Sequence, residues 1–449
     1  MEKVYRYIED NQDMYIEWLR ELCRQPSVSA QNRGMKEMVE LVKKYLHLIG
    51  TDITIIETSG YPIVYGEINQ NKNKTLSFYN HYDVQPEDPI ELWDMDPYGA
   101  IIKDGKLYAR GSSDNKGNLI ARICAVHAYQ QVYGKLPLNV KFIFEGEEEI
   151  GSPHLTDFAN NHPEKLETDG IIWEGGSRGA DGRLHVTLGV KGICYVELVA
   201  KGANTDLHSS EAAIIVNPAW RLIWALNTLK DENENILIEG FYDKVVQPNE
   251  IDRKFLKEMD FDEQYKLKTT GLDQFLLGVT GDDLKERLLY HPTCTICGME
   301  SGYIDEGSKT VLPSKAIAKI DFRLVPDQEP DDIVALLRKH LDKHGFSDIE
   351  IVRHSSKNPY KTDPDNPLAK TVIENVDSVY HKPPVIYRNS PGSSPIYDFC
   401  SNKDIPVVQI GVAHEDSRFH APNENIYIKD YIDGIKMTAT VIHEFAKEK

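Results

Sequence analysis

The sequence predicts an α/β fold with a mostly parallel central sheet, flanking helices and an inserted α+β domain. Three observations lead to this prediction. Short apolar strands alternate with helical segments up to about residue 189, longer strands with two helices fill about residues 190–355, and the first pattern returns over 356–449. Alternating strands and helices are typical of layered folds in which helices cover a largely parallel sheet. We therefore expect a first domain built from 1–189 and 356–449.

The chain begins with helical segments and then changes to strands. Apolar residues at helical spacing predict one amphipathic helix over about residues 5–23 and another over about 35–49, where Gly50 ends it. Three short β-rich runs follow, at residues 52–58, 62–68 and 75–80. They are the first expected strands of the central sheet.

A long helix and two further strands complete the first stretch. The helix covers about residues 116–133, and Ser113 or Asp114 is the expected cap at its start. The apolar runs "LNVKFIFEG" and "TDGIIWEGG" are expected strands, with a helical stretch near 154–161 between them. This order repeats the strand and helix alternation.

The second stretch predicts a small α+β domain over residues 190–355, with one sheet covered by two helices. Its expected strands are "GICYVELVAKG", "SKAIAKIDFRLVP" and "IEIVRH", and its expected helices are "NPAWRLIWALNTLK" and "DDIVALLRKHLDKHG". Residues 231–305 are polar, acidic and weakly periodic, and we interpret them as an insertion. After residue 356, "IPVVQIG" is an expected buried strand, and the helical pattern of "YIDGIKMTATVIHEFAKE" closes the first domain.

Composition limits the possible partners and compartment. The 449 residues carry a formal net charge of -20, which argues against a surface for nucleic acid or anionic membranes. No apolar run approaches the roughly 18 residues of a membrane helix, and the first 30 residues do not resemble a signal peptide. Six scattered cysteines suit a reducing cytoplasm. Cys294 and Cys297 form a lone C-x-x-C, and we expect neither a metal nor a redox site there.

Several acidic and histidine side chains follow predicted strand ends. Functional groups of α/β sheets collect at the carboxyl ends of strands. The candidates are His81, Asp83, Asp114, Glu147, Glu148, Glu149, Glu174 and His420. If the strand before His81 continues through Tyr82, then His81 and Asp83 face the same side.

Each candidate alone has a plain structural interpretation. Asp114 can cap a helix, the three glutamates can be a solvated charge run, Glu174 can be a surface charge, and His420 can be an ordinary loop residue. Together they form a nitrogen and oxygen ligand set without thiolates, which suits zinc, manganese or cobalt. One carboxylate can bridge two such ions about 3.5 to 4 Å apart, and a neighbouring glutamate can accept a proton from bound water.

Six motifs in a fixed order carry a family resemblance. "HYDVQP", "GSSDNKG", "EGEEEIGS", "DLHSS", "RLVP" and "HAPNE" resemble the dinuclear zinc hydrolase family that contains carnosinase-like dipeptidases, acetylornithine deacetylase, succinyl-diaminopimelate desuccinylase and carboxypeptidase G-type enzymes. The resemblance spans nearly the whole chain and is strongest to the carnosinase-like dipeptidases. It implies a zinc exopeptidase-like first domain, an inserted lid and dimerisation domain, and a homodimer.

The resemblance also implies a role for each candidate. The implied ligands are His81 and Glu174 at one ion, Glu149 and His420 at the other, and Asp114 as the bridge. Asp83 would orient the ring of His81. Glu148 would be the general base that generates a metal-bound hydroxide, and a cis peptide bond would follow Asp114. Many relatives have an aspartate where Glu174 stands.

Four further residues would contact the substrate. The resemblance implies that Arg323 of "DFRLVP" grips a substrate carboxylate, for which a planar guanidinium is well suited. His208 of "DLHSS" would reach the active site of the partner subunit. Gly392 and Ser393 of "NSPGSSP" stand where the family has a glycine-rich substrate loop.

Three functions remain open at this point. The first is a two-metal exopeptidase that cleaves dipeptides or similar short substrates with a free carboxylate. The second is an N-acyl-amino-acid deacylase with the same mechanism. The third is a non-catalytic metal-binding protein of the same fold, against which an intact Glu148 argues, because a binding protein needs no proton acceptor.

Overall fold

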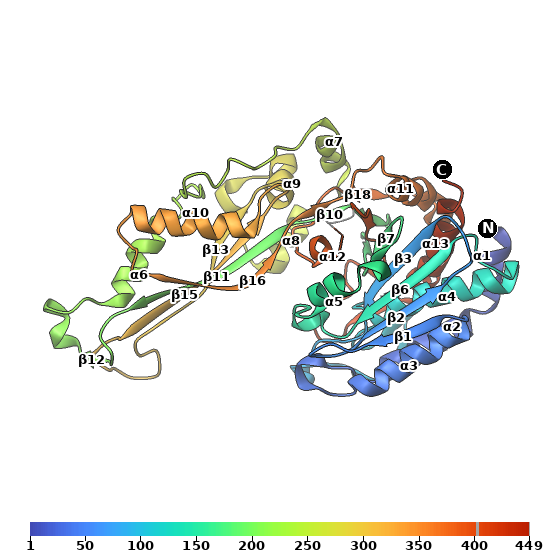
Figure 1. Cartoon of the computed structure of the whole chain (residues 1–449), viewed down its shortest axis with the longest axis horizontal. Coiled ribbons are helices and arrows are strands. Elements are labelled where there is room, and N and C mark those ends of the chain that lie inside the picture. Colours follow the sequence, from blue (N-terminus) through green and yellow to red (C-terminus); the bar gives the residue numbers. More distant parts are fainter. Residues whose placement is uncertain (401–403, 449) are drawn as a thin grey trace.

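The structure is a computed structural model that describes residues 1–400 and 404–448. It has two parts, seen side by side in Figure 1. We call the part around a six-stranded sheet the body, and the part around a four-stranded sheet, residues 192–357, the arm. The chain passes between them next to the short paired strands β10 (Gly189–Val190) and β17 (Tyr360–Lys361).

The body sheet has the strand order β1-β2-β6-β3-β7-β19. Its strands are β1 (Asp52–Ile56), β2 (Ile63–Ile68), β6 (Asn139–Glu145), β3 (Thr75–His81), β7 (Ile171–Trp173) and β19 (Val407–Val408). Neighbours from β6 to β19 run parallel, whereas β1, β2 and β6 pair antiparallel. The predicted α/β class with a mostly parallel sheet is confirmed.

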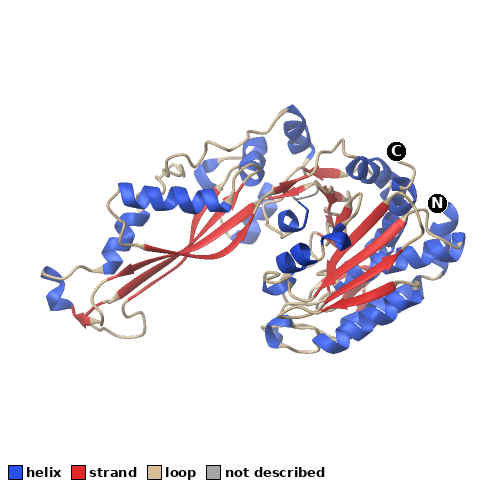
Figure 2. Cartoon of the chain, viewed as in Figure 1, coloured by secondary structure: helices blue, strands red, loops and turns tan. Residues whose placement is uncertain are grey.

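Helices cover both faces of this sheet, which Figure 2 shows in blue around the red strands. They are α1 (Glu2–Asp10), α2 (Gln12–Arg24), α3 (Met35–Leu48), α4 (Lys116–Tyr133), α5 (Leu155–Asn161), α11 (Pro367–Tyr380), α12 (Ile396–Cys400) and α13 (Ile428–Phe445). Phe78 packs into the core shared with α4 and α13, and its neighbour Tyr79 packs into a second core with α5 and α12. Because successive strand residues point to opposite faces, β3 is buried on both.

Two local predictions for the body are wrong. The helix expected over residues 5–23 is interrupted at Asn11, whose φ of -114° and ψ of 18° separate α1 from α2. Neither Ser113 nor Asp114 caps α4, because Asn115 occupies the N-cap position and makes no side-chain cap bond. The Ser113 hydroxyl instead donates to Glu424.

Short strand pairs frame the loops around the body sheet. They are β9 (His185–Thr187) with β18 (Val385–Tyr387), β8 (Ser177–Arg178) with β20 (Ala413–His414), and β21 (Asn425–Tyr427) with β5 (Lys106–Tyr108) and β4 (Ile101–Lys103). Apart from the hairpin of β4 with β5, these pairs join segments far apart in the chain. The loop between β20 and β21, which contains His420, is thereby held at both of its ends.

The arm sheet is antiparallel, with the order β13-β15-β11-β16. Its strands are β13 (Thr293–Ser301), β15 (Lys315–Leu324), β11 (Gly192–Lys201) and β16 (Glu350–Lys357). Helices α6 (Pro218–Leu226) and α10 (Pro330–Lys343) share the core of one face with residues such as Ile320 and Phe322. The insertion predicted over 231–305 is therefore partly wrong, because its last segment is the edge strand β13.

The rest of that segment connects the arm to the body. It contains α7 (Glu250–Glu258), α8 (Glu263–Thr270) and α9 (Gly281–Tyr290). Leu256 and Tyr290 pack against Val385 of the body strand β18. The buried carboxylate of Asp252 accepts a hydrogen bond from Arg388 Nε at 2.9 Å. These contacts join the two parts near the point where the chain passes between them.

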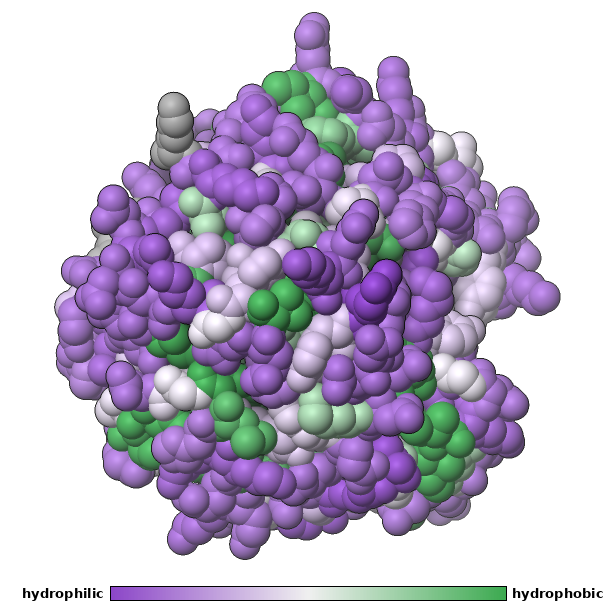
Figure 3. All heavy atoms as spheres, turned by 90° about the vertical axis from the view of Figure 1, so that its right-hand side faces the viewer, coloured by the Kyte–Doolittle hydropathy of each residue, from purple (hydrophilic) through white to green (hydrophobic). Residues whose placement is uncertain are grey.

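The body surface that faces the viewer in Figure 3 is mostly hydrophilic, with small separate hydrophobic areas. Scattered apolar residues of this kind are normal on soluble surfaces. Among the described residues, each helix is too short or too polar to cross a membrane.

Candidate metal centre

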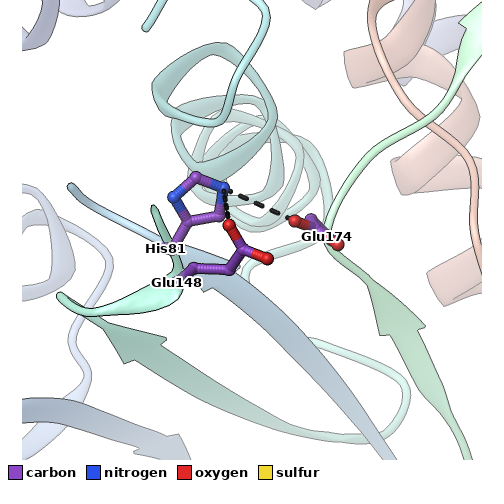
Figure 4. Close-up of side chains that lie close together, drawn as sticks. All are labelled: His81, Glu148 and Glu174. Carbon is purple, nitrogen blue, oxygen red and sulfur yellow. Dashed lines mark ion pairs between the residues drawn. The ribbon is translucent and has the colours of Figure 1, made fainter. Parts of the chain in front are cut away.

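The candidate side chains gather at the carboxyl edge of the body sheet. Strand β3 ends at His81, and the parallel register pairs His81 with Glu145, the last residue of β6. Glu148 and Glu149 follow on the short 3-10 helix η3 (Glu148–Ile150). Glu174 comes directly after β7, which is paired with β3. The three strands therefore bring these residues to one place, as Figure 4 shows for His81, Glu148 and Glu174.

The first group surrounds the ring of His81. Its Nε2 atom lies 3.1 Å from Asp114 Oδ1, 3.5 Å from Glu174 Oε1 and 3.9 Å from Glu148 Oε2. One ligand atom each of His81, Glu148 and Glu174 lies within 4.8 Å of the others, so the three can hold a cation. His81 is fully buried.

The second group surrounds the ring of His420. Its Nε2 atom lies 3.0 Å from Asp114 Oδ2 and 3.0 Å from Glu149 Oε2. Asp114 thus directs one oxygen toward His81 and the other toward His420. His81, Asp114 and Glu149 also form a set that can hold a cation. The peptide bond between Asp114 and Asn115 is cis, as the resemblance implied.

Asp83 lies behind His81 and does not face the carboxylates. His81 Nδ1 is 3.1 Å from the Asp83 backbone oxygen and 3.3 Å from Oδ1, which leaves Nε2 directed into the site. The Asp83 carboxylate also accepts hydrogen bonds from Ser29 Oγ and from the backbone nitrogens of Glu148 and Glu149. A buried carboxylate in this position fixes the ring orientation of a histidine.

Negative charge exceeds positive charge in the cluster. Burial, followed by the charge of Glu174, raises the pKa of Glu148 well above its usual range. Burial also raises the pKa of Glu149. Burial disfavours a charge on His81, but hydrogen bonds that its ring donates to Asp114 and Asp83 hold its pKa well above the usual value. A cation placed among these groups would relieve the repulsion between the carboxylates.

The residues present fit divalent cations. Glu149 Oε1 is buried and has no hydrogen-bond partner in the described part of the chain. Such an oxygen is costly unless something positive faces it. Two imidazoles and several carboxylates without thiolates form the donor set expected for zinc, manganese or cobalt.

The predicted substrate residues fall in two places. Arg323 Nη1 donates to Ser393 Oγ at 3.0 Å, and Arg323 Nε donates to Asp321 at 3.1 Å, so the structure brings Arg323 and Ser393 together. Gly392 is exposed beside them. The exposed His208 lies on β12 (Leu207–His208), paired with β14 (Val311–Leu312) at the end of the arm farthest from the body sheet (Figure 1). His208 is therefore not brought to the cluster of its own chain.

Sequence reasoning missed two residues of the site. Gln85 Nε2 donates to both the backbone oxygen and Oε2 of Glu149, at 3.0 Å each. Glu424 accepts a hydrogen bond from the backbone nitrogen of Asp114 at 3.0 Å. Both stand inside the quoted motifs "HYDVQP" and "HAPNE", so motif membership was the signal that could have found them.

The Peptidase family M20/M25/M40 model matches residues 77–444. The chain belongs to this family. The M20 chain is accordingly a metal-dependent peptide hydrolase, and the predicted enzyme class and family resemblance are confirmed.

Individual relatives of the M20 chain match it over almost its full length. The Beta-Ala-His dipeptidase of Mus musculus is 28% identical, with 100% of this chain and 96% of the mouse protein covered. The Cys-Gly metallodipeptidase dug1 of Schizosaccharomyces pombe is 27% identical, with 99% of this chain and 98% of the yeast protein covered. The solved structure of the M20 family metallo-carboxypeptidase Sso-CP2 from Sulfolobus solfataricus has a TM-score of 0.91 and 40% identity. The match covers 97% of this chain and 99% of that chain. The crystal structure of human carnosine dipeptidase 1 has a TM-score of 0.81 and 28% identity, and the match covers 100% of this chain and 99% of the human chain.

Proposed function

We propose that the chain is a homodimeric two-metal exopeptidase that cleaves the amide bond of dipeptides or similar short substrates with a free C-terminal carboxylate. The observation that carries the proposal is Asp114, whose two oxygens face His81 at 3.1 Å and His420 at 3.0 Å. A carboxylate between two imidazoles is suited to bridge two ions. The dipeptidase relatives from mouse and fission yeast support the substrate class.

Five residues would hold two ions, for which zinc is our first choice and manganese or cobalt are alternatives. They are His81 and Glu174 at one ion, Glu149 and His420 at the other, and Asp114 between the two. When bound, such ions act as Lewis acids that acidify water and polarise a carbonyl oxygen. Asp83 holds the His81 ring with Nε2 directed toward the ligands.

Glu148 is the proposed general base. It directly precedes Glu149 on η3, and its Oε2 atom lies 3.9 Å from His81 Nε2, beside the proposed ligands. Glu148 takes a proton from the attacking water as the carbon–oxygen bond forms. It then delivers this proton to the amine nitrogen as the carbon–nitrogen bond breaks, so that the residue ends the cycle as it began.

Recognition of the free carboxylate is assigned to Arg323 and its neighbours. The guanidinium of Arg323 already bonds Ser393 Oγ at 3.0 Å, and the exposed Gly392 lies next to Ser393. A planar guanidinium binds a carboxylate through two parallel hydrogen bonds. This contact would restrict cleavage to the C-terminal end of a substrate.

The dimer is proposed from the far end of the arm. His208 lies there, beyond the reach of the cluster in its own chain, and among the described residues its ring bonds Ser210 and Thr310 of the arm. On helix α6 of the arm, Trp220 is 56% exposed and Trp224 is 55% exposed. Such an apolar surface suits a second arm. In this proposal residues 190–355 form a lid and dimerisation domain inserted between 1–189 and 356–449.

Cleavage of longer peptides is the second candidate. The 40% identity to a metallo-carboxypeptidase over 97% of this chain favours it. The cluster and Arg323 would serve both activities, because each needs a free C-terminal carboxylate.

The test is a substrate panel for the protein loaded with zinc, manganese or cobalt. The panel contains dipeptides, the same dipeptides with amidated C-termini, tripeptides and N-acyl amino acids. We expect hydrolysis of the free dipeptides and much slower hydrolysis of the amides. Faster turnover of tripeptides would favour the carboxypeptidase, and faster turnover of N-acyl amino acids would favour the deacylase. No turnover of any substrate would favour a non-catalytic metal-binding protein.

A further inference from the structure

Glu424 is a buried carboxylate with an unusual number of partners. It is 0% exposed and lies on the loop between β20 and β21, four residues after His420. Oε2 accepts hydrogen bonds from Arg110 Nη1 at 2.9 Å and from Gly111 N at 3.0 Å. Oε1 accepts from Ser113 N at 2.9 Å, from Ser113 Oγ at 2.9 Å and from Asp114 N at 3.0 Å. Both oxygens are therefore fully used within one short stretch of chain.

The donors to Glu424 lie in residues 110–114, which end at Asp114, the residue between His81 and His420. The backbone nitrogen of Asp114 is one of the five donors, so Glu424 contacts the very residue whose oxygens face His81 and His420. Glu424 and Asp114 are 310 positions apart in the chain. The pairing of β21 with β5 brings the two loops together, and the Glu424 side chain extends this contact to the backbone of Asp114 itself.

The charge of Glu424 suits its partners. Backbone N–H groups that converge on one point form a site for an anion, and a carboxylate accepts from several of them at once. Arg110, only 1% exposed, supplies a positive partner. An amide in place of the carboxylate would direct an NH₂ group at some of these donors, and two donors repel each other.

We propose that Glu424 is a positioning residue that holds Asp114 and His420 at the spacing that a divalent cation requires. The inference rests on the proposed metal centre. Glu424 acts through the backbone of Asp114 and through the loop that it shares with His420. Groups of this kind around metal ligands affect metal affinity about 10- to 100-fold.

A purely structural role would give a different result, and the chain offers a matched control. Asp252 is also a buried carboxylate, 2% exposed, that accepts from an arginine, Arg388 Nε at 2.9 Å, and from a backbone nitrogen, Asn249 N at 3.1 Å. It lies on α7, away from the cluster. Its loss removes a comparable buried ion pair without touching a candidate ligand.

The experiment compares Glu424→Gln with Asp252→Asn in the full chain. Dissociation constants for zinc and cobalt are measured by competition with a chelator, together with the visible absorption spectrum of bound cobalt and the melting temperature of the metal-free protein. For Glu424→Gln we expect a 10- to 100-fold higher dissociation constant for at least one ion and a changed cobalt spectrum. For Asp252→Asn we expect a lower melting temperature with dissociation constants within about twofold of the parent.

Ser113→Ala keeps the test decisive if Glu424→Gln does not fold. It removes one of the five hydrogen bonds and should raise a dissociation constant about fivefold, the equivalent of one ordinary hydrogen bond. Unchanged dissociation constants and spectra in the folded variants would overturn the proposal for Glu424. A parent protein that binds no divalent ion at all would instead overturn the proposed metal centre.

Discussion

The body and the arm are both sheets covered by helices, yet their strands are buried in different ways. In the body, β3 and β6 are buried along nearly their whole lengths on both faces. In the arm, β15 alternates, with Lys319 exposed and Ile320 and Phe322 buried. Parallel strands with helices on both faces show the first pattern, and an antiparallel sheet with one open face shows the second. The difference decides what each part can offer to a reaction.

Two histidines show the consequence. His81 is fully buried, and its Nδ1 faces Asp83, so only Nε2 is available to the site. His208 is exposed and bonds Ser210 and Thr310 within the arm. In the proposed enzyme, the body would hold the ligands at fixed positions, whereas the far end of the arm would present His208 to a second subunit. Substitutions in the two parts should fail differently.

The largest expected effect belongs to the body. Glu148→Gln should keep both ions and lose about 10² to 10⁴ in kcat, because the amide accepts no proton while the ligands remain. Elemental analysis and single-turnover kinetics on the same preparation check this.

Glu148 also lies in one of the sets that can hold a cation, which supplies the contrary outcome. Parallel losses of one ion and of activity would make Glu148 a ligand. Arg323→Lys is a useful comparison, because it should raise KM and leave the metal content unchanged.

The next effect belongs to the arm. His208→Ala should lower kcat by about 10² to 10³ with little change in metal content, as expected for a donor to an oxyanion. If His208 serves the partner's site, mixing His208→Ala subunits with Glu148→Gln subunits should restore activity, because one of the two sites then regains both groups. If subunit exchange is verified but activity does not recover, His208 does not serve the partner's site.

Removal of metal should lower the stability of the body and leave that of the arm unchanged. Ions at about 100 times their dissociation constant stabilise the folded state by about 2.7 kcal/mol. Chelation should therefore speed amide hydrogen exchange in α4 and β3 of the body and leave α10 and β15 of the arm unchanged. Equal changes in both parts would mean that they unfold as one unit.

The smallest effect concerns Lys191, at the junction of the two parts. Lys191 is 2% exposed and donates to the backbone oxygens of Leu288 and His291, and burial lowers its pKa to about 8. Below pH 8 the charge is present in both the folded and the unfolded chain, so the full cost of burying it remains. Between about pH 8 and pH 10 the unfolded chain binds more protons, so the free energy of unfolding should rise by about 1 kcal/mol or more.

Urea titrations of the parent and of Lys191→Met at several pH values check this expectation. The rise should be smaller in the variant. Lys116, whose pKa burial also lowers to about 8, contributes equally to both proteins and cancels in the difference. If the free energy of unfolding depends on pH in the same way in both proteins, burial of the Lys191 charge does not reduce stability.

Local signals in the sequence predicted most strands and helices, and the strand ends at which several candidate residues lie. Strand β3 and helix α4 are apolar runs with clear ends. Strand β3 ends at His81, as expected for a functional group at the carboxyl end of a strand. The same signals failed at Asn11, which interrupts a continuous helical pattern, and at β13, whose exposed edge lacks the apolar run of a buried strand. The first error occurs because the helical pattern continues across the break, and the second because the local pattern of β13 is weak.

Tertiary structure alone decided which groups meet. Asp114 lies between His81 and His420. Glu424 accepts from the Asp114 nitrogen across 310 positions, because the antiparallel pairing of β21 with β5 brings their segments together. The sequence contained each of these side chains but no local feature that pairs them. Their contacts follow from packing between distant segments, whereas helix and strand periodicity reports only on neighbours within a few residues.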